Sequence, residues 1–222
     1  MKRDSTNRTL FDDSQAIARD RAILGDGAVF LRGFALDRAA KLMKEIERVA
    51  SRAPFRHMTT PGGFRMSVAM TNCGTLGWVT DRAGYRYDRI DPEASTAWPA
   101  MPEAFLALGR AAAREAGYPG FEPDACLINR YAPGSSLSLH QDRNEKDFGA
   151  PIVSLSLGLP ATFLFGGLKR TDRPRRLPIL HGDVAVWGGS TRLAFHGIAK
   201  LKDGVHPMTG ACRFNLTLRK AG

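Results

Sequence analysis

The chain has 222 residues, of which 43% are hydrophobic and 24% are charged, which suits one domain with a full core and room for a lid. Its formal net charge of +10 favours a polyanionic partner such as nucleic acid, although a basic soluble protein without such a partner has the same charge. Three cysteines without C-x-x-C spacing argue against a disulfide framework and a cysteine-bound zinc cluster. We therefore expect a reducing, cytoplasmic compartment.

The first half of the chain predicts one strand and one helix, followed by a segment rich in glycine and aromatic residues. Residues 1–20 predict a frayed or weakly helical segment without the apolar stretch of a secretory signal. A short strand is expected at 28–33, and Asp37 is expected to cap a helix that ends near Pro54. The apolar residues of this helix recur at intervals of three and four, which predicts one face packed on the core.

Residues 58–98 combine glycines, short strand-like pieces and large aromatic side chains, among them Trp78, Tyr85 and Tyr87. Such rings either pack in a core or stack on nucleobases, where each stacked base contributes about 1–3 kcal/mol. Glycine-rich connections also suit a mobile lid. Composition alone does not decide between these roles.

The second half predicts a helix followed only by strands. Pro102 begins an amphipathic helix over 103–116, which Gly117 ends. The uncharged stretch 148–168 is long enough to cross a bilayer, but prolines and glycines divide it into two strands, so we expect no membrane span. Eight short strands with turn residues between them predict a jelly roll. They are expected at 124–131, 136–141, 152–157, 161–165, 176–180, 183–187, 193–198 and 212–218.

His140 and Asp142 are separated by one residue at the end of an alternating strand. Residues two apart in a strand point to the same face, so an imidazole and a carboxylate are expected side by side. His196, in a second strand-like run, is the best candidate for a third ligand. Two histidines and one carboxylate on one side of a metal are typical of non-haem Fe(II) oxygenases. A His-x-Asp on a surface strand is the ordinary alternative.

The last predicted strand alternates strictly between polar and apolar residues. Arg213, Asn215 and Arg219 share one of its faces. Because a guanidinium group binds a carboxylate with two parallel hydrogen bonds, two arginines on one face suit a dicarboxylate. Together with the metal ligands, this strand suggests 2-oxoglutarate as a co-substrate.

With these residues in view, the chain resembles the AlkB-type dioxygenases, which depend on Fe(II) and 2-oxoglutarate and repair alkylated nucleic acids. The resemblance runs from about residue 25 to the C-terminus. It implies a mainly β, α+β fold, in which a double-stranded β-helix (124–219) has two supporting helices and a nucleotide-recognition lid (58–98), all in a single domain (1–222). The motifs that carry the resemblance are residues 129–134, 140–142, 156–160, 181–183, 187–189, 195–197 and 213–219.

The resemblance also assigns roles to individual residues. It makes His140, Asp142 and His196 the iron ligands. It places Asn129, Tyr131 and Arg213 on the far carboxylate of 2-oxoglutarate, and Arg219, with Asn215 nearby, toward the end that chelates iron. It places Trp78, Tyr85 and Arg170 on the substrate, with Tyr87 close by.

One position departs from the family pattern. The residue two after the metal aspartate is acidic in the pattern and is Asn144 here. Asparagine keeps a hydrogen bond to the base but loses the negative charge, so we expect weaker discrimination in favour of cationic lesions.

The activity implied by the resemblance is oxidative demethylation of 1-methyladenine and 3-methylcytosine in single-stranded DNA or RNA. Formaldehyde is released, and 2-oxoglutarate and O2 are converted to succinate and CO2. We expect a monomer that binds no membrane. Two alternatives are a 2-oxoglutarate-dependent hydroxylase of a protein or small molecule, and a catalytically silent nucleic-acid-binding module.

Overall fold

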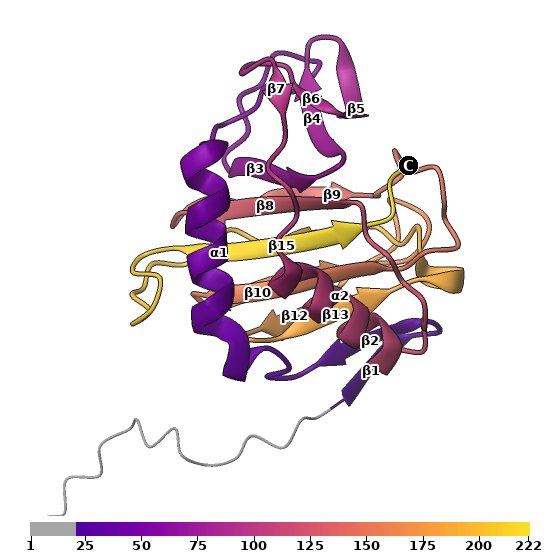
Figure 1. Ribbon diagram of the computed structural model, residues 1–222. Coiled ribbons are helices and arrows are strands. Elements are labelled where there is room, and N and C mark those ends of the chain that lie inside the picture. The colour runs from indigo at the N-terminus through magenta and orange to yellow at the C-terminus, as the bar shows by residue number, and fades with distance from the viewer. Residues whose placement is uncertain (1–20) are drawn as a thin grey trace, which may run out of the picture.

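The computed structural model describes residues 21–222, so the expectation for residues 1–20 lies outside the described part. Two antiparallel sheets form the body of the molecule (Figure 1). The larger sheet contains, in spatial order, β1 (Arg21–Gly25), β2 (Ala28–Leu31), β13 (Val184–Trp187), β10 (Ile152–Gly158), β15 (Arg213–Arg219), β8 (Ala125–Tyr131) and β3 (Ala69–Gly74). The smaller sheet contains β12 (Arg175–Ile179), β11 (Ala161–Phe165), β14 (His196–Ile198) and β9 (Leu137–His140).

The eight strands expected after residue 124 divide equally between the two sheets. Strands β13, β10, β15 and β8 are the four adjacent strands between β2 and β3 in the larger sheet, and the other four form the smaller sheet. This arrangement confirms the mainly β fold with a double-stranded β-helix core.

Alternation along the strands explains why the larger sheet has two different faces. In β10, Val153, Leu155 and Leu157 join the hydrophobic cluster that also contains the buried residues of both helices. The helices are α1 (Ala39–Arg52) and α2 (Glu103–Glu115), and Figure 1 shows both on the same side of this sheet. The opposite face carries polar residues such as Ser154 toward the cavity described below. One face of the sheet therefore stabilises the fold, and the other is free to carry chemistry.

Residues 75–97 lie at one end of the molecule, as four short strands (Figure 1). The hairpin formed by β4 (Gly77–Asp81) and β5 (Gly84–Asp88) is a two-stranded sheet of its own, as is the pair β6 (Ile90–Asp91) and β7 (Thr96–Ala97). Strand β3, although it lies within the range expected for the lid, pairs with β8 in the larger sheet. Within residues 21–222, no helix is long and apolar enough to span a bilayer.

Two local expectations differ from the structure, and one strand was missed. Asp37 does not cap α1: it lies in a short 3-10 helix (Leu36–Arg38), and the N-cap is Arg38, whose side chain makes no capping bond. Residues 192 and 193 form a turn after a second 3-10 helix (Gly189–Thr191), and 194 and 195 are irregular, so the strand begins only at His196. Strand β1 was not expected. It is an edge strand with an exposed face, and its short sequence has no clear alternation.

The end of α2 agrees with expectation. Gly117 has a positive φ of 93°, a backbone conformation that costs glycine little. The N–H groups of Gly117 and Tyr118 donate to the carbonyls of Arg114 and Ala113, which is the hydrogen-bond pattern of a Schellman motif.

Candidate active site

Strand pairing in the smaller sheet brings two histidines together. His196 of β14 lies directly opposite His140 of β9, and their ring centroids are 4.4 Å apart. The close approach of these strands requires Gly197, because a Cβ atom there would lie 2.6 Å from the carbonyl oxygen of Leu137. The sheet itself therefore sets the spacing of the two imidazoles.

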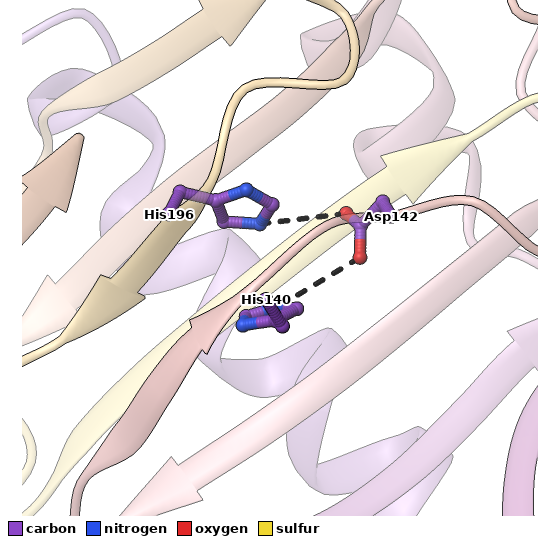
Figure 2. Close-up of side chains that lie close together, drawn as sticks. All are labelled: His140, Asp142 and His196. Carbon is purple, nitrogen blue, oxygen red and sulfur yellow. Dashed lines mark ion pairs between the residues drawn. The ribbon is translucent and has the colours of Figure 1, made fainter. Parts of the chain in front are cut away.

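Asp142 completes the cluster from just beyond the end of β9, since the strand ends at His140 and Asp142 lies in the irregular segment that follows. Its Oδ1 is 3.8 Å from Nε2 of His140, and its Oδ2 is 3.7 Å from Nε2 of His196 (Figure 2). One ligand atom from each of the three residues lies within 4.8 Å of the others. The three side chains face a common point, as a metal site requires.

Hydrogen bonds to the backbone select the tautomer of both histidines. Nδ1 of His140 bonds the carbonyl of Ser138 at 2.9 Å, and Nδ1 of His196 bonds the carbonyl of Ala194 at 3.0 Å. A carbonyl oxygen only accepts, so Nδ1 carries the proton and Nε2 presents its lone pair to the cluster. Burial, together with the neighbouring His140, lowers the pKa of His196 to about 3. His196 is therefore a neutral ligand at neutral pH.

Asp142 is kept ionised by a buried arginine. Nε and Nη2 of Arg219 donate to Oδ2 of Asp142 at 2.9 and 2.8 Å. Burial alone would raise the pKa of Asp142, but the charge of Arg219 holds it well below its usual range. A carboxylate with two imidazoles is a donor set that suits iron(II).

A cavity of about 680 Å³ opens beside these three residues, a size typical of small-molecule sites. The polar face of β15 lines it with Arg213, Asn215, Thr217 and Arg219, as the strict alternation of this strand indicated. Asn215 organises this surface: its Nδ2 donates to Ser154 and its Oδ1 accepts from Asn129 and Thr217.

Arg213 is a buried cation without a carboxylate partner among the described residues. Its relative exposure is 1%, its Nε donates to Oγ of Ser156, and its Nη1 has no hydrogen-bond partner within residues 21–222. Its guanidinium lies 4.9 Å from the centre of the Tyr131 ring. Because a buried charge is costly unless it is paired, these groups fit the carboxylate of a ligand such as 2-oxoglutarate.

Asn129 fits this ligand less directly. Its Nδ2 is bonded to Asn215, and its Oδ1 is buried without a donor among the described residues. In this arrangement Asn129 supports the floor of the cavity and presents an acceptor, not a donor.

Comparison with known proteins agrees with this geometry. Residues 27–219 match the model of the 2OG-Fe(II) oxygenase superfamily. The chain is 62% identical to the alpha-ketoglutarate-dependent dioxygenase AlkB of Escherichia coli K12 over 199 residues, which cover 90% of this chain and 92% of that protein.

The chain belongs to the AlkB family of 2OG-Fe(II) oxygenases.

More distant relatives extend the likeness. The tRNA demethylase abh1 of Schizosaccharomyces pombe is 33% identical over 131 residues, or 57% of this chain and 42% of that protein. The solved structure of OsALKBH1 has a TM-score of 0.80 and 27% identity, covering 90% of this chain and 100% of that one.

As an AlkB-family enzyme, the protein is a dioxygenase that uses Fe(II), 2-oxoglutarate and O2. The two imidazoles and the carboxylate of the cluster suit the metal, and the buried Arg213 suits the co-substrate.

Other predicted residues reach the same cavity from the hairpin β4–β5 and from a loop. The rings of Trp78 and Tyr85 are stacked, with centroids 5.8 Å apart, and both line the cavity. Nε1 of Trp78 donates to Oδ1 of Asn144 at 3.4 Å. Arg170 also lines the cavity, and its Nη1 donates to the carbonyl of Leu139.

Tyr87 is placed differently from Trp78 and Tyr85. It does not line the cavity within the described chain, and its hydroxyl donates to Oε1 of Glu145 at 2.7 Å. Glu145 itself is buried and bonds Arg192. Neither Glu145 nor Arg192 was predicted to belong to the site. They lie 47 residues apart, so no local pattern in the sequence indicates their contact.

Proposed function

We propose that the enzyme removes methyl groups from 1-methyladenine and 3-methylcytosine in single-stranded DNA or RNA, acting as a monomer. The observation that carries the proposal is the stacked pair Trp78 and Tyr85, which lines the same cavity as the metal ligands His140 and His196. The net charge of +10 suits a polyanion. The name of the yeast relative, a tRNA demethylase, agrees with this substrate class.

In the proposed reaction, bound iron supplies the site at which O2 and 2-oxoglutarate oxidise the methyl group, giving succinate, CO2, formaldehyde and the restored base. The side chains of the protein bind and orient 2-oxoglutarate and hold the metal ligands in place. Arg213 and Tyr131 hold the far carboxylate of 2-oxoglutarate, while Arg219 keeps Asp142 ionised for the metal. Asn215 maintains the polar surface on which the co-substrate rests.

Residues 58–98 act as the nucleotide-recognition lid in this proposal. A base that has left its stack lies against the ring of Trp78, with its methyl group toward His140. Arg170 lines the same cavity and suits a phosphate or the base. Methylation of a Watson–Crick nitrogen prevents pairing, so the lesion is easily extruded and single strands are preferred.

The test is mass spectrometry of a single-stranded oligonucleotide that carries one 1-methyladenine, incubated with protein, Fe(II), 2-oxoglutarate, ascorbate and air. We expect methyl loss with wild-type protein and none with the His140→Ala variant, while an unmethylated oligonucleotide keeps its mass. Succinate without methyl loss would contradict this substrate and favour a hydroxylase of a protein or small molecule. Oligonucleotide binding that ignores both metal and His140→Ala, with neither product, would favour a silent binding module.

A further inference from the structure

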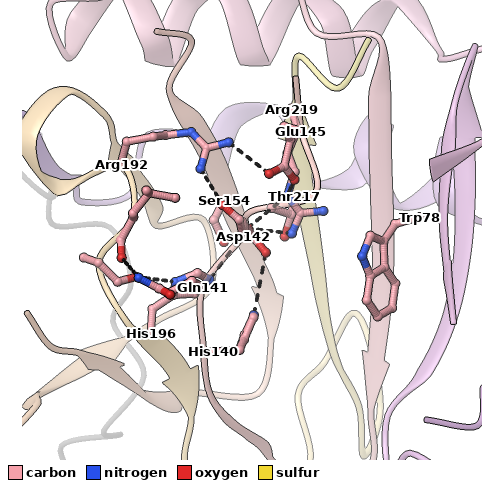
Figure 3. A network of polar contacts seen from close by, with 12 residues as sticks. Trp78, His140, Gln141, Asp142, Glu145, Ser154, Arg192, His196, Thr217 and Arg219 are labelled. Atoms are coloured by element: carbon pink, nitrogen blue, oxygen red, sulfur yellow. Dashed lines mark hydrogen bonds and ion pairs between the residues drawn. The ribbon is translucent and has the colours of Figure 1, made fainter. Parts of the chain in front are cut away.

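The metal-binding carboxylate belongs to a cluster of four buried ionic side chains. Glu145, Arg192 and Arg219 have side-chain exposures of only 1%, 3% and 6%, and the fourth member is Asp142. Figure 3 shows Glu145 between the two arginines, on the side of Asp142 away from the histidines. Glu145 and Arg192 do not line the cavity in the described part of the chain, so neither is placed to touch a ligand there.

Glu145 contacts three different parts of the chain, through two hydrogen bonds and one ion pair. Its Oε1 accepts a hydrogen bond from the hydroxyl of Tyr87 at 2.7 Å and lies 3.5 Å from Nε of Arg219. Its Oε2 accepts from Nη2 of Arg192 at 3.2 Å. A buried carboxylate with this many donors is strongly held, and losing it would leave buried donors unpaired.

The two arginines connect Glu145 to the side chain and to the backbone of Asp142. Arg219 binds the side-chain oxygen Oδ2, as described above, and Nη1 of Arg192 donates to the backbone carbonyl of Asp142 at 2.8 Å. The segment 141–146 contains no helix or strand. Because no backbone ladder holds this segment, these side-chain bonds contribute directly to its position.

Glu145 also balances charge beside the metal site. The cluster holds two guanidinium groups and two carboxylates. Without the Glu145 charge, both arginines would act on a cation site that has only one carboxylate, and Arg219 would compete more strongly for Asp142.

Tyr87 extends the same cluster to the hairpin that carries the stacked rings. Its Cα pairs with that of Trp78 across β4 and β5. This two-stranded sheet is fastened at its base, where Asn72 bonds the backbone of Trp78, and Tyr87 ties it to the metal-binding segment. A hairpin of two strands is marginally stable alone, so such a tie matters for its position.

We propose that Glu145 is a positioning residue that couples the hairpin β4–β5 to the metal centre. Through Tyr87 it holds Trp78 and Tyr85 over the cavity, and through Arg219 and Arg192 it holds Asp142. The link to substrate rests on the proposed function, whereas the links to the hairpin and to the metal do not.

The first test compares Tyr87→Phe with Tyr118→Phe in the full-length protein. Both changes remove one hydroxyl that makes one hydrogen bond of 2.7 Å, but Tyr118 bonds the carbonyl of Gly27, away from the site. We expect amide hydrogen exchange in residues 77–88 to accelerate about tenfold or more in Tyr87→Phe only, because a bond to a charged acceptor is lost. Exchange at the wild-type rate in Tyr87→Phe would overturn the proposal.

The second test measures Mn(II) affinity by calorimetry for Glu145→Gln, with Glu122→Gln as the control because it removes a carboxylate from a surface pair with Arg110. We expect a loss of about tenfold to a hundredfold in Glu145→Gln, faster exchange in residues 77–88, and no change in Glu122→Gln. Wild-type affinity in a folded Glu145→Gln protein would contradict the proposal. If this variant does not fold, the exchange measurement on Tyr87→Phe decides.

A third measurement tests whether the link between Glu145 and the hairpin β4–β5 affects catalysis. In Tyr87→Phe we expect KM for the methylated oligonucleotide to rise more than kcat falls, because the stacking surface is displaced while the metal site is intact. If wild-type protein does not demethylate the oligonucleotide, the proposed function fails, but the exchange and Mn(II) results still test the coupling.

Discussion

The environment of Arg213 indicates what kind of ligand the cavity binds. Its charge is buried on the inner face of β15, one of its nitrogens has no partner among the described residues, and Tyr131 covers its plane. Burial lowers the pKa of Arg213, but a guanidinium remains protonated at neutral pH. A carboxylate that enters this pocket therefore gains a strong, charge-assisted partner.

We expect Arg213→Lys to weaken 2-oxoglutarate binding by about tenfold to a hundredfold, because an ammonium cannot make the paired bonds of a guanidinium. Calorimetric titration of the Mn(II)-loaded protein with 2-oxoglutarate measures the loss. Arg176→Lys, on the exposed side of β12, serves as the matched control. Equal affinity in both variants would exclude Arg213 from the co-substrate site.

Asn144 is the residue at which substrate preference is expected to differ from the family pattern. Its Oδ1 accepts from Trp78 and it lines the cavity. We expect Asn144→Asp to raise the rate on 1-methyladenine, a cationic base, relative to a neutral methylated base, because a carboxylate attracts the positive charge. The ratio of the two demethylation rates, taken from competition reactions, measures the effect. An unchanged ratio would show that this charge does not select the lesion.

Individual residues divide clearly into those that a sequence reveals and those that it does not. The alternation of Arg213 and Arg219 follows strand geometry and indicates one face in advance. The spacing of His140 and Asp142 indicated a shared site, although Asp142 lies just beyond the end of β9. Glu145 and Arg192 carry no such signal, since each is a single charged residue whose partner lies far along the chain.

At the scale of elements, a second pair of histidines lies away from the metal cluster, with His181 in the turn between β12 and β13 and His206 in the loop between β14 and β15. His181 and His206 have ring centroids 4.4 Å apart. The N–H of Gly158 donates to Nδ1 of His181, and that of Met208 donates to Nδ1 of His206. Both rings therefore carry their proton on Nε2, and a second proton on Nδ1 would face a backbone donor.

Burial and the neighbouring His206 lower the pKa of His181 below its usual value, with a smaller opposing effect of Asp183. A histidine with a lowered folded pKa contributes stability above its unfolded pKa of about 6.5, and this contribution is lost as the pH falls. We expect the urea midpoint to fall between about pH 7.5 and pH 5, and to fall less in His181→Asn, whose Oδ1 keeps the acceptor for Gly158. An equal fall in both proteins would contradict this origin.

Elements with a strong period were easier to predict than their ends. Helix α2 and seven of the eight predicted strands agree closely with the structure, because alternation and glycine signals are local. The start of α1 depends on a 3-10 turn, and the late start of β14 depends on a turn at 192–193, which tertiary contacts decide. Aspartate is a residue type typical of an N-cap, but here Asp37 lies within the 3-10 helix that precedes α1.

At the scale of the whole molecule, the cavity joins parts that meet only after folding. Its walls come from the hairpin β4–β5, from both sheets and from the segment after β9. Ligands that bind there interact with the folded state alone and therefore shift the folding equilibrium. The pairing of the sheets was not readable from the sequence except through family resemblance, because strand order depends on contacts far apart in the chain.

We expect Mn(II) and 2-oxoglutarate together, each at about one hundred times its dissociation constant, to raise the thermal midpoint by about 10–20 °C, since each such ligand stabilises the native state by about 2.7 kcal/mol. Scanning calorimetry measures the rise. In Arg213→Lys at the same concentrations, the part due to 2-oxoglutarate should shrink while that due to Mn(II) stays. If 2-oxoglutarate did not change the thermal midpoint of the wild-type protein, this would argue against a co-substrate pocket in this cavity.

The direct pairing of His140 with His196 makes the metal site a marker of correct strand registry. A slip of one residue between β9 and β14 would turn one imidazole to the other face of the sheet. A bulkier residue than Gly197 would separate the strands. In a purified preparation, the fraction of molecules that binds one equivalent of Mn(II) therefore counts those whose smaller sheet is natively aligned. Metal titration thus serves as a quality assay for the fold as well as for the enzyme.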